Sequence, residues 1–117
     1  MTVTEIKIQT MLELSKQHWI LEEKIQKIEE KMIKHKAQAL FLFEHPALTT
    51  LCKLKQNNAH LWFAILNPKK YDESFFDQKK EQSTQLLQKA SQEVDDFENE
   101  AKKILEKLPV PKVKAKL

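Results

Sequence analysis

The single cysteine and one of the four histidines could be proposed as a nucleophile and its base. Cys52 and His60 lie eight residues apart. Nucleophilic catalysis would also need a group that orients the base and donors that stabilise an oxyanion, and no recognisable pattern supplies them. Cys52 follows Leu51 in an apolar stretch, which predicts a small, buried and inert cysteine. We therefore expect a protein without enzyme activity.

The histidines do not form a metal-binding pattern. His18 and His35 are seventeen residues apart, which corresponds to about 25 Å along one helix, so they cannot share a metal ion within a chain. Their place among apolar residues predicts polar layers that fix helix register, or an interface that responds to pH. His45 and His60 match neither the H-E-x-x-H nor the Glu-x-x-His pattern. We expect neither a metal nor a cofactor.

A cluster of carboxylates near the C-terminus has two interpretations. Its members are Glu93, Asp95, Asp96, Glu98 and Glu100. The cluster lacks the glycine and the ligand spacing of a calcium-binding loop. On a helix these residues would form a solvated face, or a patch that docks a basic surface or imitates an anionic substrate.

The distribution of the lysines bears on whether the chain binds nucleic acid. Six of them lie close together on the predicted first helix: Lys16, Lys24, Lys27, Lys31, Lys34 and Lys36. Four glutamates lie between these lysines along the predicted helix and offset their charge: Glu22, Glu23, Glu29 and Glu30. The formal net charge is only +3, and the chain has no arginine, the residue most used for reading bases. A nucleic-acid-associated accessory protein, such as a plasmid-transfer or phage factor, is therefore the alternative function.

The composition limits the fold. None of the 117 residues is glycine, which excludes P-loops and dinucleotide-binding fingerprints, and the abundant Glu, Lys, Gln, Leu, Ile and Ala favour long helices. A single cysteine allows no internal disulfide, so a reducing cytosol, of the producing cell or of a host, is expected. No stretch approaches 18 apolar residues, and residues 1–15 do not resemble a secretion signal. We expect no membrane association.

The first helix is predicted over residues 3–43, where no proline interrupts the chain and Thr2 with Glu5 forms a capping box. Apolar residues and two histidines recur at steps of three and four, forming a seam: Met11, Leu14, His18, Leu21, Ile25, Ile28, Met32, His35, Ala39 and Leu42. Further apolar residues lie off this seam and predict a second contact surface: Trp19, Ile20, Ile33, Ala37 and Leu40.

The middle of the chain admits two interpretations. His45-Pro46 is typical of a helix start, and Asn67-Pro68 of a helix end. The simplest division has a short helix that ends at Asn57 and Asn58, followed by a third helix that those residues cap. A single bent helix over residues 46–66 is equally open. A buried strand over residues 61–66 would have no partner strand, so we do not expect one.

The last helix is predicted from Asp72 or Ser74 to about Leu108, before two prolines. It carries a second seam, interrupted at Lys80: Phe76, Ser83, Leu87, Ala90, Val94, Phe97, Ala101, Ile104 and Leu108. The two long helices are expected to pair antiparallel. The predicted fold is all-α, an elongated antiparallel helical hairpin or a three- to four-helix bundle, with one domain over residues 1–108 and a flexible basic tail over 109–117.

Aromatic residues near the predicted turn are the candidates for partner binding, because tryptophan and tyrosine often anchor protein interfaces. They are Trp62, Phe63, Tyr71, Phe75 and Phe76. Core packing is the competing explanation for them. Trp62 and Phe63 would point about 100° apart on a helix, which leaves one of them exposed.

In size, helix content and its Lys-, Gln- and Glu-rich composition, the chain resembles the small helical inhibitors that intracellular bacterial pathogens encode beside secreted enzymes, including enzymes that deamidate or crosslink ubiquitin. No motif carries this resemblance, so it assigns no site residue. It implies a regulator that binds a partner enzyme and blocks its substrate-docking surface. A homodimer that buries leftover seam surface is a further expectation.

Overall fold

The computed structural model describes residues 1–34 and 44–107, and every regular element in those ranges is a helix. Helix α1 spans Val3–Lys34, α3 spans Pro46–Leu66 and α4 spans Glu73–Glu106. The prediction of an all-helical fold is therefore confirmed. The remainder of the first predicted helix, with His35, Ala37, Ala39, Leu40 and Leu42, lies outside the described residues, as do Leu108 and the tail 109–117.

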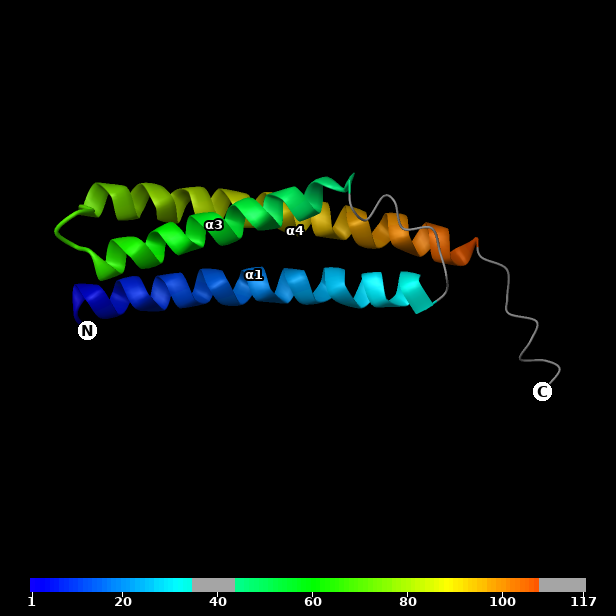
Figure 1. Cartoon of the computed structure of the whole chain (residues 1–117), viewed down its shortest axis with the longest axis horizontal. Coiled ribbons are helices and arrows are strands. Elements are labelled where there is room, and N and C mark those ends of the chain that lie inside the picture. Colours follow the sequence, from blue (N-terminus) through cyan, green and yellow to red (C-terminus); the bar gives the residue numbers. More distant parts are fainter. Residues whose placement is uncertain (35–43, 108–117) are drawn as a thin grey trace.

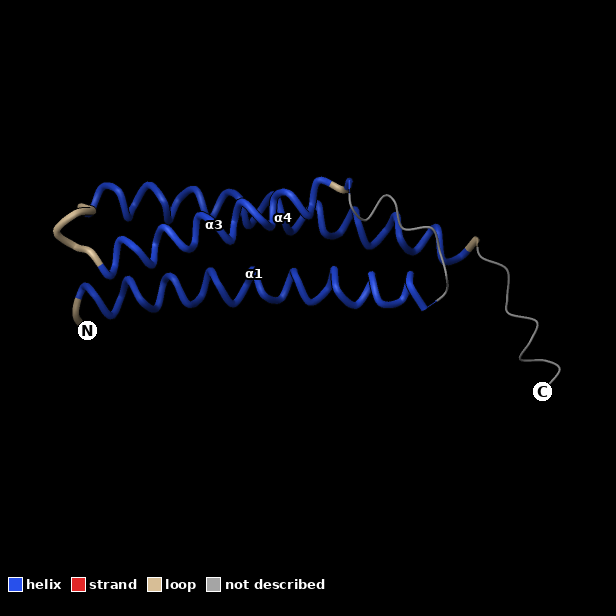
Figure 2. Tube along the Cα trace, in the orientation of Figure 1, coloured by secondary structure: helices blue, strands red, loops and turns tan. Residues whose placement is uncertain are grey.

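The helices lie side by side along their lengths and form an elongated molecule (Figure 1). Helix α1 has 32 residues and α4 has 34, so each is about 50 Å long. Figure 2 shows helices α1, α3 and α4 and the short connection between α3 and α4.

The two long helices run parallel, and α3 runs antiparallel to both (Figure 1). The amino-terminal ends of α1 and α4 meet where Lys7 Nζ lies 3.0 Å from Glu73 Oε1 and 5.1 Å from the ring centre of Phe76. The prediction that these two helices pair antiparallel is therefore wrong. Helix α3, with 21 residues, runs back toward the amino-terminal end of α1 before α4 begins.

Short-range signals set the helix ends. Thr2 Oγ1 accepts a hydrogen bond from the backbone N–H of Glu5 at 3.1 Å, as the capping box predicts. His45 caps α3 because its Nδ1 accepts from the N–H of Ala47 at 3.1 Å, with Pro46 in the first turn. Asp72 caps α4 through a 2.9 Å bond from the N–H of Phe75.

Residues 46–66 form one helix, so the division into two helices is wrong. Asn57 and Asn58 cap nothing, because they are buried in the middle of α3. The helix ends at Asn67, whose N–H donates to the carbonyl of Phe63 at 3.0 Å. Asn67 has a φ of −127°, so a chain without glycine can end the helix here without left-handed backbone.

The core lies along the line where all three helices meet, in two clusters. The larger contains Leu21, Ile25, Met32, Ala47, Leu51, Ala90, Val94, Phe97 and Ala101. The smaller contains Leu14, Leu61, Ala64 and Phe76. Every described residue of the two predicted seams is buried or partly buried, and Lys80, where the second seam is interrupted, is exposed.

Candidate functional site

Cys52 and His60 both lie on the exposed side of α3. Their separation of eight residues corresponds to about 12 Å along the helix, too far for direct proton transfer. The His60 ring instead lies 6.4 Å from the ring of Phe63. The prediction that Cys52 is buried is wrong: the core side of α3 runs through Leu51 and Leu54, and the next position, about 100° further round the helix, faces outward.

His18 is buried on the core side of α1, where the seam predicts it. Its Nε2 lies 3.4 Å from Glu22 Oε1, one turn along the same helix, but makes no hydrogen bond with suitable geometry. This nitrogen is the only buried side-chain nitrogen or oxygen without a hydrogen-bond partner among the described residues. It therefore marks a place where the described fold leaves a polar group unsatisfied.

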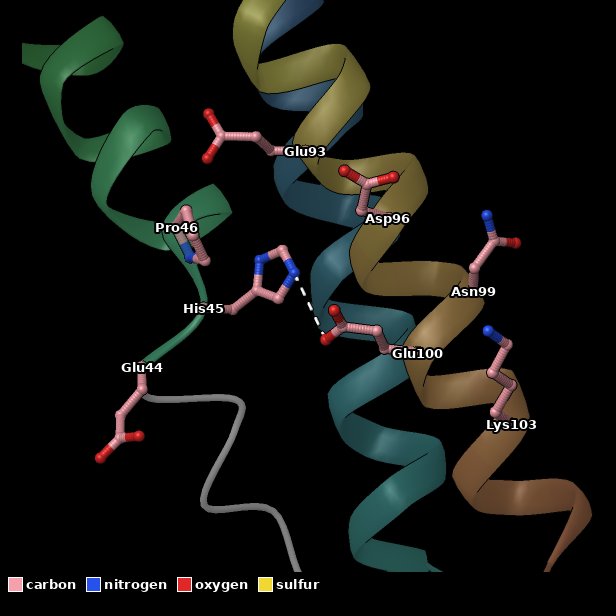
Figure 3. A pocket seen from close by; sticks show the side chains of 8 residues that line it. All are labelled: Glu44, His45, Pro46, Glu93, Asp96, Asn99, Glu100 and Lys103. Atoms are coloured by element: carbon pink, nitrogen blue, oxygen red, sulfur yellow. Dashed lines mark ion pairs between the residues drawn. The ribbon is translucent and has the colours of Figure 1, made fainter.

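Three of the five carboxylates in the acidic cluster of α4, Glu93, Asp96 and Glu100, border a hollow of about 550 Å³ beside the start of α3 (Figure 3). His45 projects toward it, with Nε2 3.6 Å from Glu100 Oε2, and its ring packs edge-on against Phe97 at 5.1 Å. Glu93 accepts a 2.7 Å hydrogen bond from the hydroxyl of Thr50. Two of these acidic residues thus contact the first turns of α3. The described part of the chain contains no group of three or more ligands that could hold a metal ion.

The five predicted partner-binding residues occupy three environments. Trp62 and Phe63 are 41% and 50% exposed, so both reach the surface. Tyr71 and Phe75 stack on each other at 4.6 Å and cover the end of the smaller core cluster. Phe76 is only 4% exposed and belongs to that cluster, so core packing, the competing explanation, accounts for its position. Its position on the α4 seam already indicated the core.

A hollow of about 300 Å³ between α1 and α3 contains both tryptophans of the chain, Trp19 and Trp62. Trp19 is 64% exposed. Met11, His18 and Ala59 also line the hollow. Trp19 was recognised only as a residue off the first seam; its pairing with Trp62 depends on how α3 packs against α1, which no local pattern specifies.

The outer face of α3 is unusually poor in charge. We define it as the exposed residues of that helix: Pro46, Thr49, Cys52, Lys53, Lys55, Gln56, Ala59, His60, Trp62, Phe63 and Leu66. The helix has no aspartate or glutamate, and its two lysines are its only permanently charged residues. An exposed helix face with aromatic side chains and few charges is the composition expected of a protein interface.

Comparisons with protein-family models, curated proteins and solved structures found no match to this chain. The geometry of its own residues is therefore the basis for a functional assignment. None of the described helices is long and apolar enough to cross a membrane.

Proposed function

We propose that this protein is a non-enzymatic protein-binding module that regulates a partner enzyme by covering the enzyme's substrate-docking surface. The observation that carries the proposal is the outer face of α3, where Trp62 and Phe63 are exposed on a helix without carboxylates. Burial of large exposed aromatic side chains by a partner lowers the free energy of the complex, and such residues are frequent interface hot spots.

The mode of regulation we propose is steric. A narrow helical molecule presents a long face and few enclosed pockets, which suits it to covering another surface. The resemblance in size and composition to helical inhibitors encoded beside secreted bacterial enzymes supports the same mode. A partner that acts on ubiquitin is the specific form of this proposal, and the cytosol of the bacterium or of its host is the proposed location.

The test starts with affinity capture of tagged protein from lysates of source and host cells, with and without nuclease. The partner is then purified and its affinity measured for wild type, the double variant Trp62→Ala/Phe63→Ala, and Leu12→Ala. Leu12 is the control because it is an exposed apolar residue on α1 outside both predicted contact surfaces. We expect the double variant to lose at least about tenfold in affinity, since a hot-spot side chain contributes about 2 kcal/mol or more, and the control to bind like wild type.

Three results would contradict this proposal. The double variant could bind the captured protein as tightly as wild type, which would place the interface elsewhere. The complex could leave the partner's activity unchanged, which would remove the inhibitory role. Capture that disappears after nuclease treatment, together with binding that weakens steeply as salt rises, would instead support the nucleic-acid accessory function of the lysines on α1.

A further inference from the structure

Two hollows adjoin along the outside of the α1–α3 contact. One is the hollow lined by the two tryptophans, the other has a volume of about 360 Å³, and Glu22 and Lys55 line both. Ile25, Leu48 and Leu51 line the second hollow. We refer to the two hollows together as the α1–α3 groove.

The groove is long enough to hold a helix of about five turns. On α1 its lining residues extend from Met11 in the first hollow to Glu29 in the second. Eighteen residues of helix span about 27 Å, or five turns. An amphipathic helix of about this length could bury an apolar stripe along the whole groove, because helix-in-groove recognition uses side chains three and four positions apart.

The walls of the groove carry opposite charges. On the α1 wall, the charged lining residues are Glu22 and Glu29; on the α3 wall, the charged lining residue is Lys55. Neither Glu29 nor Lys55 forms an ion pair within the described part of the chain. A helix in the groove would therefore meet carboxylates along one edge and an ammonium group along the other.

We propose that the α1–α3 groove binds one amphipathic helix of about eighteen residues from a partner protein, with basic side chains along the edge that faces α1 and acidic side chains along the edge that faces α3. Charges that flank an apolar stripe select partners and orientation in the same way in coiled coils. This inference rests on the proposed protein-binding function and specifies the chemistry of the partner.

A second copy of the chain fits the groove less well than a single helix does. Two copies placed groove to groove would oppose a hollow with a hollow, so neither would fill the other. A partner helix instead supplies a ridge of side chains that can enter between Trp19 and Trp62.

The probes are three synthetic 18-residue helical peptides that lack tryptophan and share one leucine stripe. One has lysine along one edge and glutamate along the other, the second has glutamate on both edges, and the third has lysine on both. Emission of Trp19 and Trp62 reports binding, because the chain has no other tryptophan and both line the groove. We expect the split-charge peptide to bind at least about tenfold more tightly than the other two at physiological salt.

Reversing the charge of the α3 wall gives the decisive comparison. Lys55→Glu makes both walls acidic, so the tightest-binding peptide should change from the split-charge one to the all-lysine one. Lys53→Glu is the matched control, since it makes the same charge change on the exposed side of α3 outside the lining of the groove. The control should leave the order of the three peptides unchanged.

Several outcomes would overturn the proposal. They are equal affinity for all three peptides, no change in tryptophan emission at millimolar peptide, an unchanged order in Lys55→Glu, or a concentration-dependent dimer in sedimentation that Lys55→Glu disrupts. The proposed function would stand independently if the peptides fail while Trp62→Ala/Phe63→Ala still releases the captured partner.

Discussion

The side-chain amide of Asn57 donates a 2.7 Å hydrogen bond to the hydroxyl of Ser83, which joins the middle of α3 to α4. The same amide donates to the carbonyl of Lys79 at 2.6 Å, and the Ser83 hydroxyl donates to Asn58 Oδ1 at 2.7 Å. All three polar side chains are buried. This network is satisfied only when the two helices are aligned as they are here, so it fixes their register.

Ser83→Ala should lower the free energy of unfolding by about 1–3 kcal/mol, because the buried amide groups of Asn57 and Asn58 would each lose a hydrogen-bond partner. Urea unfolding followed by circular dichroism measures the loss. Thr84→Ala is the control, since the Thr84 hydroxyl is exposed and bonds only within its own helix. Equal losses in the two variants would show that the network adds nothing to stability.

Phe97→Ala should be the most destabilising single truncation among those considered, at about 3–5 kcal/mol, because Phe97 is fully buried in the larger core cluster. Chemical unfolding of the variant measures the change. Phe63→Ala removes the same side chain from an exposed site and should cost far less. A comparable loss at both positions would contradict the packing described for α4.

His45→Ala should lower the free energy of unfolding by about 1 kcal/mol, since the backbone N–H of Ala47 would lose its cap. Asparagine is a good cap residue, so His45→Asn should recover most of that loss. Thermal unfolding of the three proteins provides the comparison. If the asparagine variant is as unstable as the alanine variant, the contribution of His45 comes from its contacts with Phe97 and Glu100 instead.

The thiol of Cys52 should react with a small alkylating reagent in the folded protein, because the side chain is exposed. We expect the rate under native conditions to be within a few-fold of the rate in urea, since the fold gives little protection. Mass spectrometry at timed intervals follows the reaction. Full protection in the native state would contradict the exposed position of Cys52 and would support the buried position that the sequence predicts.

The sequence predicted the start and end of α3 and the start of α4 well because their determinants are local, but it wrongly placed a helix boundary at Asn57 and Asn58. Proline after His45, asparagine before Pro68 and the carboxylate of Asp72 act within a few residues, and the structure shows their caps. The described parts of both seams also face the core, since steps of three and four define one side of any helix.

The relative direction of the helices, and the residues that meet between them, could not be predicted from local patterns. A repeating apolar seam fits a parallel or an antiparallel partner equally well, so the parallel arrangement of α1 and α4 required the full path of α3. Asn57 and Asn58 are typical of helix caps, but their hydrogen-bond partners on α4 lie more than twenty residues away in the chain. Helical spacing predicts that one of Trp62 and Phe63 is exposed, whereas the structure exposes both. The position of Trp19 beside Trp62 depends on how α3 packs against α1.

The parallel arrangement of α1 and α4 also bears on the order of folding. Helices α3 and α4 are joined by the short segment 67–72, so their contacts can form after closure of a small loop. Contacts between α1 and α4 link residues about sixty or more positions apart, which makes them slower to form. We therefore expect a pre-formed α3–α4 hairpin onto which α1 docks late, and amide hydrogens of α1 that exchange with solvent before those of α4.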